Sequence, residues 1–213
     1  MAIVVTWAGN LSPAERAGRV CQVINDVDTW HQLAALVPLA EAQEFRDCWD
    51  IGEQEAGLRL LVSALLANDV AISETVRAQI SVLAETWGER EALTPQIIQC
   101  RSDGESAPAV ALTEQAGVLV TGDTGTADRE LVGLTLVPWI ICTRCDQVLM
   151  RVHAREVWGA LSYLARHYAI TKPEGAVVAR LFPANAAGDA FDSLLWSCHQ
   201  ALSPTADAQY PQP

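Results

Sequence analysis

The spacing of apolar residues divides the chain into a helical first part and a strand-rich second part. A short apolar run at residues 2–7 predicts one strand, and a helix is expected over 12–24, with Ser12 as its N-cap. Two further helical pieces are expected within residues 26–50, and longer helices over 53–69 and 73–87. The last of these has the clearest amphipathic pattern.

The pattern changes near residues 94–96, where loops rich in Gly, Ser, Asp and Pro begin to separate short apolar runs. These runs predict an antiparallel β-meander from about residue 96 to residue 152. Its expected strands lie within 96–100, 109–113, 117–121, 131–141 and 147–152. Pro138 has no N–H to donate to a neighbouring strand, so we expect it at a sheet edge or at a bulge.

Two C-terminal helices are predicted, over residues 154–168 and 187–202. The segment 173–183 between them fits either a strand or a short helix, and residues 203–213 have the composition of a disordered tail. The predicted fold class is therefore α+β. We expect a mainly helical region over 1–93 and a β-meander with helices over 94–202, packed together as one globular unit.

The net charge of −12, from 26 acidic and 14 basic residues, disfavours nucleic acid as a partner and is compatible with a basic protein partner. Arginine-rich composition with a single lysine, Lys172, suggests a GC-rich bacterial genome. No apolar run approaches the roughly 18 residues of a membrane span, and the N-terminus lacks the features of a signal peptide. We therefore expect a cytoplasmic protein whose cysteines are thiols or metal ligands.

The most specific chemical motif is the pair Cys142 and Cys145, which lies between two predicted strands. Such a turn can form a zinc knuckle, and Asp146 is one of the residue types that tolerate the positive φ required after it. Structural zinc needs four ligands, and His153 is excluded because a strand would carry it about 26 Å away. The possible further ligands are Cys100, Cys198 and His199, or residues of a second copy in a homodimer.

Two other interpretations of the pair stay open. A redox dithiol requires a helix to begin at the second cysteine, and the register of apolar residues after Cys145 does not fit one. Two thiols in or near the core explain the pair as well as a metal does.

Other groups of polar residues have simpler structural explanations. Asp26 or Asp28 is expected to cap a helix more readily than to bind metal with His31. The carboxylates Glu41, Glu44, Asp47 and Asp50 are expected to form a solvated helix face, which could contact a basic partner. Three tryptophans are expected on the buried faces of helices, whereas others could line a pocket or an interface: Trp87, Trp158 and Trp196 in the first group, and Trp30, Trp49 and Trp139 in the second.

The sequence lacks the common phosphate-loop, dinucleotide, zinc-protease and serine-hydrolase motifs. The favoured hypothesis is a non-enzymatic binding or regulatory protein of the inhibitor or immunity type. The alternative is an enzyme or metal protein that uses Cys142 and Cys145, so whether the chain is an enzyme stays open. A third hypothesis is a DNA-binding regulator, because residues 164–182 faintly resemble a helix-turn-helix.

Overall fold

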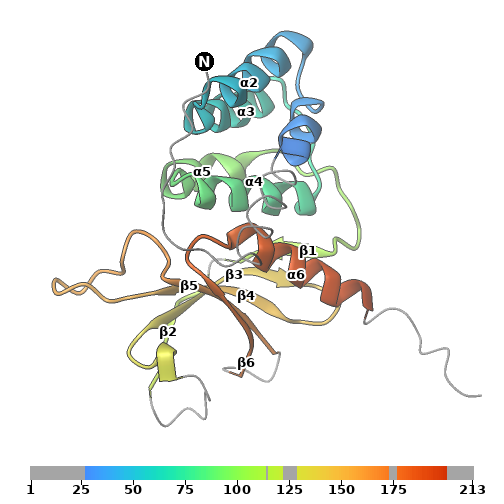
Figure 1. Ribbon diagram of the computed structural model, residues 1–213. Helices are drawn as coiled ribbons and strands as arrows, with labels where there is room; N and C mark the ends of the chain where they lie inside the picture. Colours follow the sequence, from blue (N-terminus) through green and yellow to red (C-terminus); the bar gives the residue numbers. More distant parts are fainter. Residues whose placement is uncertain (1–26, 114, 122–128, 173–176, 201–213) are drawn as a thin grey trace, which may run out of the picture.

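The computed structural model describes residues 27–113, 115–121, 129–172 and 177–200. A layer of helices stands on one face of an antiparallel sheet, and the C-terminal helix lies between the two (Figure 1). The α+β prediction is confirmed, as is the order of helices first, then strands, then a terminal helix. The strand expected over 2–7, the helix over 12–24 and the tail over 203–213 lie outside the described residues.

The helical layer contains a helical segment over residues 27–34 and four longer helices. These are α2 (Leu39–Ile51), α3 (Gln54–Ala67), α4 (Glu74–Thr86) and α5 (Arg90–Gln99). Their core is built around Trp30, which stacks on Phe45 with ring centroids 3.9 Å apart and donates its indole N–H to the Phe45 carbonyl at 2.8 Å. None of the described helices is long and apolar enough to span a bilayer.

Helix α4 begins as the sequence predicts, because the Ser73 side chain accepts a hydrogen bond from the Val76 amide at 3.2 Å. The predicted helix over residues 53–69 is also confirmed, as α3. Asp28, in contrast, lies within the first helical segment and is not its N-cap, while Asp26 lies outside the described residues.

The predicted change of structure at residues 94–96 is wrong, since the expected strand 96–100 is the end of α5. The buried guanidinium of Arg77, on α4, donates hydrogen bonds to the carbonyls of Ile97 and Cys100 at the C-terminal end of this helix. These bonds satisfy carbonyls that a helix end leaves unpaired, and Ile97 itself is buried in the helical core. Tertiary contacts therefore extend α5 past the predicted boundary.

The sheet begins at β1 (Val110–Leu112) and has the strand order β1-β3-β4-β5-β6, with β2 (Val118–Leu119) also paired to β3. The remaining strands are β3 (Thr135–Cys142), β4 (Val148–His153), β5 (His167–Thr171) and β6 (Val178–Pro183). A register shift between Pro138 and Ile140 confirms the expected bulge at the proline. Of the segment 173–183, which was expected to be a strand or a short helix, residues 178–183 form strand β6.

One face of the sheet packs on α6 (Ala187–Gln200) and on α4, and the other face packs on residues around the short 3₁₀ helix η1 (Arg129–Leu131). Trp139 of β3 donates its indole N–H to the Ser81 hydroxyl of α4 at 3.0 Å, and both residues are buried. Helix α4 is thus shared, with one side in the helical core and the other against the sheet.

The predicted helix over residues 154–168 is wrong, so one of the two expected C-terminal helices is absent. Residues 154–165 form a projecting loop, and β5 follows at His167. Gly159 adopts φ +91°, which places a turn in the middle of the expected helix. Strand β5 is then stabilised on both sides, by pairing with β4 and with β6.

The close packing of α2 and α3 predicts an unusual effect of alanine at Gly57. A Cβ at this position would lie 2.6 Å from Trp30 Cζ2 and 2.9 Å from Cys48 Cβ. Alanine normally stabilises a helix relative to glycine by about 1 kcal/mol. We nevertheless expect Gly57→Ala to lower the free energy of unfolding by about 1–3 kcal/mol because of overpacking.

Chemical denaturation of the full chain measures this change, and Ser63→Ala on the exposed side of the same helix is the control. The control should change stability by less than about 0.5 kcal/mol. A Gly57→Ala protein that is more stable than the wild type would contradict the described packing.

Candidate functional site

The Cys142–Cys145 turn has the predicted geometry. Strands β3 and β4 form a hairpin around it, the Asp146 amide donates to the Cys142 carbonyl at 3.0 Å, and the Cys142 amide donates to the Gln147 carbonyl at 2.8 Å. Asp146 has φ +55°, as expected for the residue after the knuckle. His153 pairs with Thr135 at the opposite end of the hairpin, which confirms its exclusion from this turn.

The cysteines themselves differ in state. Cys142 is disulfide-bonded, whereas Cys145 keeps a half-buried thiol. The expectation that all the cysteines are thiols or metal ligands is therefore wrong for Cys142. The two residues of the pair are not bonded to each other, and a sulfur in a disulfide offers no thiolate to a metal.

The possible further zinc ligands are only partly placed. Cys100 ends α5 and is buried in the helical core, whereas Cys142 lies in the core between the sheet and α6. Burial raises the pKa of the Cys100 thiol, which disfavours the thiolate that binds metal. Cys198 and His199 belong to α6, but their side chains are outside the description. Among the described residues, no group of three His, Cys, Asp or Glu side chains could hold a metal ion.

The acidic residues of α2 form the solvated helix face that the sequence analysis favours. On α2, Glu44, Asp47 and Asp50 are exposed and Glu41 is half-buried, as expected for a solvated helix face.

The predicted resemblance to a helix-turn-helix is wrong, because residues 167–171 and 178–183 are adjacent antiparallel strands. The prediction that Trp158 and Trp196 lie on buried helix faces is also wrong, since 74% and 63% of their surfaces are exposed.

The sequence analysis does not predict the polar junction that links the helical layer to the sheet at Glu85, near the end of α4. One oxygen of the Glu85 carboxylate accepts from Nε of Arg90 at 2.8 Å, and the other accepts from the Tyr168 hydroxyl at 3.1 Å. Arg151 of β4 lies close by, with Nη1 3.8 Å from the same carboxylate. Burial and the Glu85 charge raise the pKa of Tyr168, so its hydroxyl stays protonated and donates.

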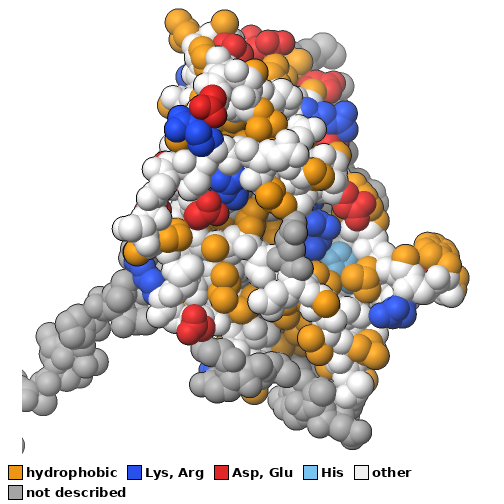
Figure 2. All heavy atoms as spheres, turned by 180° about the vertical axis from the view of Figure 1, so that it is seen from behind, with side chains coloured by type: hydrophobic (Ala, Val, Ile, Leu, Met, Phe, Trp, Pro, Cys, Tyr) orange, Lys and Arg blue, Asp and Glu red, His pale blue; other side chains and the backbone are white. Residues whose placement is uncertain are grey.

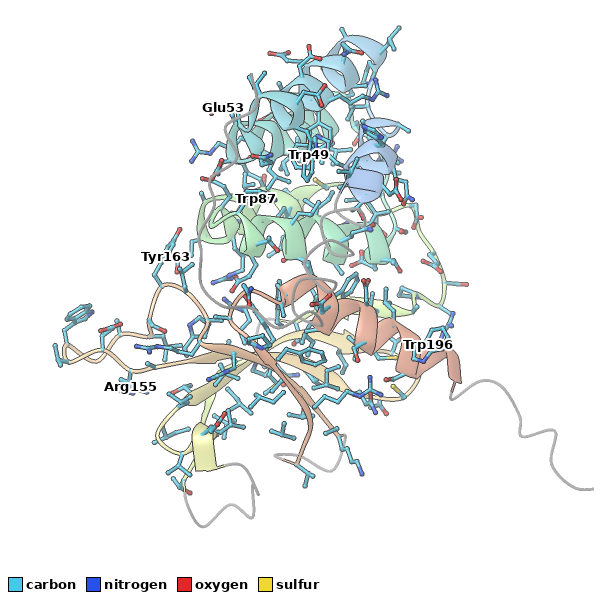
Figure 3. The ribbon with its side chains drawn as sticks, viewed as in Figure 1. Trp49, Glu53, Trp87, Arg155, Tyr163 and Trp196 are labelled. Carbon is cyan, nitrogen blue, oxygen red and sulfur yellow. The ribbon has the colours of Figure 1, made fainter. Side chains whose placement is uncertain are left out.

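An arm, residues 154–165, projects from the sheet beside this junction and connects β4 to β5. Figure 3 shows Tyr163 extending from the arm toward the helices, and its hydroxyl donates to the Gly88 carbonyl at 2.7 Å. At its base, His153 Nδ1 lies 2.8 Å from the Ser162 carbonyl, and the Ser162 amide donates to the Ala154 carbonyl at 2.8 Å. The arm is therefore tied both to the sheet and to the turn between α4 and α5.

The outer part of the arm is a hydrogen-bonded turn that carries apolar side chains. The Glu156 amide donates to the Ala160 carbonyl at 2.8 Å, and the Gly159 amide donates to the Glu156 carbonyl at 2.9 Å. Val157 and Trp158 are 97% and 74% exposed. In Figure 2, hydrophobic side chains gather at the end of the arm. The apolar residues of the arm have helical spacing, so the sequence analysis predicts a helix here. The glycine at position 159, directly after Val157 and Trp158, is nevertheless a turn signal.

No known family model, curated protein or solved structure matches this chain. The local geometry of the described residues therefore carries the functional argument.

The junction predicts unequal effects for the same substitution at two tyrosines. Tyr168→Phe removes a buried hydrogen bond to a carboxylate, so we expect the free energy of unfolding to fall by about 1–3 kcal/mol. Tyr163→Phe removes a bond at a residue that is 57% exposed, and its cost should stay below about 1 kcal/mol. Urea denaturation of both variants measures the difference, and equal losses would contradict a buried Glu85 junction.

The buried His153 predicts a stability that depends on pH. Burial, and secondarily the nearby Arg151 charge, lower the pKa of His153 from its ordinary value of 6.5. The unfolded chain therefore takes up the proton first, and stability falls as the pH drops below about 6.5, by at most about 1.4 kcal/mol per pH unit. His153→Asn keeps a donor near the Nδ1 position but does not titrate.

Denaturation at pH 7.5 and at pH 5.5 separates this contribution from those of the other groups. The loss of stability between the two pH values should be smaller in His153→Asn than in the wild type. Identical losses in the two proteins would show that His153 is not held in its neutral form.

Proposed function

We propose that the chain is a non-enzymatic binding or regulatory protein of the inhibitor or immunity type, which docks its arm into a cleft of another protein. The observation that carries this proposal is the exposure of Val157 and Trp158 at the end of an anchored arm. An exposed tryptophan next to an exposed valine leaves a large apolar area in water, and such areas commonly mark protein-binding surfaces.

The anchoring of the arm supports an interaction role. Its turn is closed by backbone hydrogen bonds, and Arg155 adds a side-chain bond to the Gly159 carbonyl at 2.9 Å. A preformed arm loses little conformational entropy when it binds, so more of the contact free energy appears as affinity. A projecting aromatic side chain also suits insertion into a concave partner surface, where buried tryptophans often dominate binding.

The partner's charge follows from the acidity of the chain. A net charge of −12 speeds encounter with a basic protein and slows encounter with acidic ones or with nucleic acid. The exposed carboxylates of α2, Glu44, Asp47 and Asp50, contribute to this field. We therefore propose a basic protein as the partner.

The alternative hypothesis of a zinc or redox function rests on the Cys145 thiol at the knuckle. Elemental analysis of protein purified without chelator tests it, since a structural site should hold close to one zinc per chain. A zinc content below about 0.2 per chain would remove the metal version, and a content near one would favour it over the docking proposal.

The docking proposal predicts different results for two exposed tryptophans. Trp158→Ser should weaken capture of the partner from an extract of the source organism by about 30-fold or more, as expected for a central interface residue. Trp196→Ser, a matched change at the exposed face of α6, should leave capture within about 2-fold of the wild type. Quantitative mass spectrometry of the captured proteins measures both effects, and circular dichroism confirms that each variant is folded.

Three outcomes would contradict the proposal. The first is equal capture by the wild type and by Trp158→Ser, and the second is a captured partner that is acidic. The third is concentration-dependent self-association of the wild type that Trp158→Ser abolishes, because the arm would then bind a second copy of this chain in a homodimer.

A further inference from the structure

A cavity of about 230 Å³ lies where α4 and α5 meet β1, β3 and β4. Arg90 and Arg151 both line it, together with the indole of Trp139 and the hydroxyl-bearing Ser81. The rest of the wall is mainly aliphatic, with further neutral polar groups from Thr113 and Gln115. The cavity is independent of the arm's exposed tip, and no function above uses it.

Arg151 is the unusual member of this wall. Its side chain is only 9% exposed, and neither Nε nor Nη1 has a hydrogen-bond partner. The nearest carboxylate, Glu85, is 3.8 Å from Nη1, which is too long for a hydrogen bond. Buried guanidinium nitrogens without hydrogen-bond partners are unfavourable, so folded proteins rarely keep them without a reason.

The balance of charge at the cavity favours an anion. Arg90 and Arg151 provide two positive charges, and among the described residues Glu85 is the buried carboxylate that lies within 4 Å of both. Glu91 is exposed to solvent, so water screens its charge. Burial and the Arg90 charge lower the pKa of Arg151 to about 10, which leaves it protonated at neutral pH. Among the buried groups described at the cavity, positive charge therefore exceeds negative charge.

The uncharged walls of the cavity indicate the shape and polarity of the part of the ligand that is not the anion. The Arg151 guanidinium lies 5.7 Å from the centre of the Trp139 ring, and the indole N–H is already bonded to Ser81. The flat ring and the aliphatic wall suit an apolar body better than a hydrated ion. A cavity of about 230 Å³ is below the usual range of drug-sized sites, so the ligand must be small.

We propose that this cavity binds a small organic carboxylate with a flat apolar body, and that Arg151 is the charge partner of its carboxylate. Arg90 is a positioning residue, because its Nε is bonded to Glu85 and holds that carboxylate beside Arg151. Bound carboxylate would supply acceptors for the unpartnered nitrogens of Arg151. These hydrogen bonds would offset the free-energy cost of burying the Arg151 guanidinium.

Calorimetric titration of the full chain with benzoate, 4-hydroxybenzoate and indole-3-acetate tests the proposal. At least one should bind saturably with a Kd of about 1 mM or tighter, which is reasonable for ligands of this size. Benzamide, which has the same shape as benzoate without its charge, should bind at least 10-fold more weakly than benzoate if benzoate binds. Inorganic phosphate should also bind at least 10-fold more weakly than the best carboxylate.

The matched variants are Arg151→Met in the cavity and Arg155→Met on the exposed arm. Arg151→Met should weaken carboxylate binding at least 10-fold. The Tm of the ligand-free variant should nevertheless equal or exceed that of the wild type, because the substitution removes buried nitrogens that have no hydrogen-bond partner, while Glu85 keeps its bond to Arg90. Arg155→Met should leave binding within 2-fold. A purely structural role for Arg151 predicts the reverse, a lower Tm with unchanged binding.

The proposal is overturned if none of the three carboxylates binds by about 20 mM, or if benzamide binds as tightly as benzoate. Tighter binding of phosphate than of any carboxylate would instead assign the cavity to inorganic or esterified phosphate. Failure of Arg151→Met to fold would show that the guanidinium is structural and would also overturn the proposal. None of these results depends on whether the arm binds a protein.

Discussion

The fold depends on α4, a helix buried on two sides, and on the carboxylate near its end. Ile80 and Leu83 face the helical core, whereas Ala78 and Val82 face the sheet. Because α4 ends between two layers, Glu85 must be buried, and a buried carboxylate requires partners. Arg90 and Tyr168 supply them from α5 and β5. The same junction sets the position of the arm, which is bonded to the turn after α4, and of Arg151 in the cavity wall.

The parts of the fold that the sequence predicts correctly are those that local chemistry determines. The amphipathic pattern over residues 73–87 corresponds to α4, Asp146 takes the positive φ of the knuckle, and Pro138 coincides with the bulge in β3. The incorrect predictions arise where one spacing of apolar residues is compatible with both a helix and another structure. Residues 154–168 have helical apolar spacing, but tertiary pairing with β4 and β6 makes the last of them a strand. Similarly, Arg77 of α4 extends α5 through contacts distant in the sequence.

The candidate sites show the same difference between features set by neighbouring residues and features set by tertiary contacts. The turn at Cys142 and Cys145 was predictable because its residues are adjacent, although the disulfide at Cys142 was not. The cavity could not be predicted, since its lining residues Ser81, Arg90 and Arg151 come from three separate elements. One signal was present in the sequence: Arg151 lies between the apolar residues Met150 and Val152, two residues after the buried Leu149 and on the same face. A charged residue at an inward position is costly, and such positions often serve a function.

The central structural claim is that the Glu85 carboxylate joins the helices to the sheet, next to the turn at Gly88 that holds the arm. Amide hydrogen exchange of the Glu85→Gln protein tests it most directly, because exchange reports local stability residue by residue. Loss of the carboxylate leaves Arg90 and Arg151 without a counter-charge. The account predicts faster exchange at the end of α4, in β5 and at the Ser162 amide in the arm. Faster exchange confined to α4, with the Ser162 amide as protected as in the wild type, would contradict it.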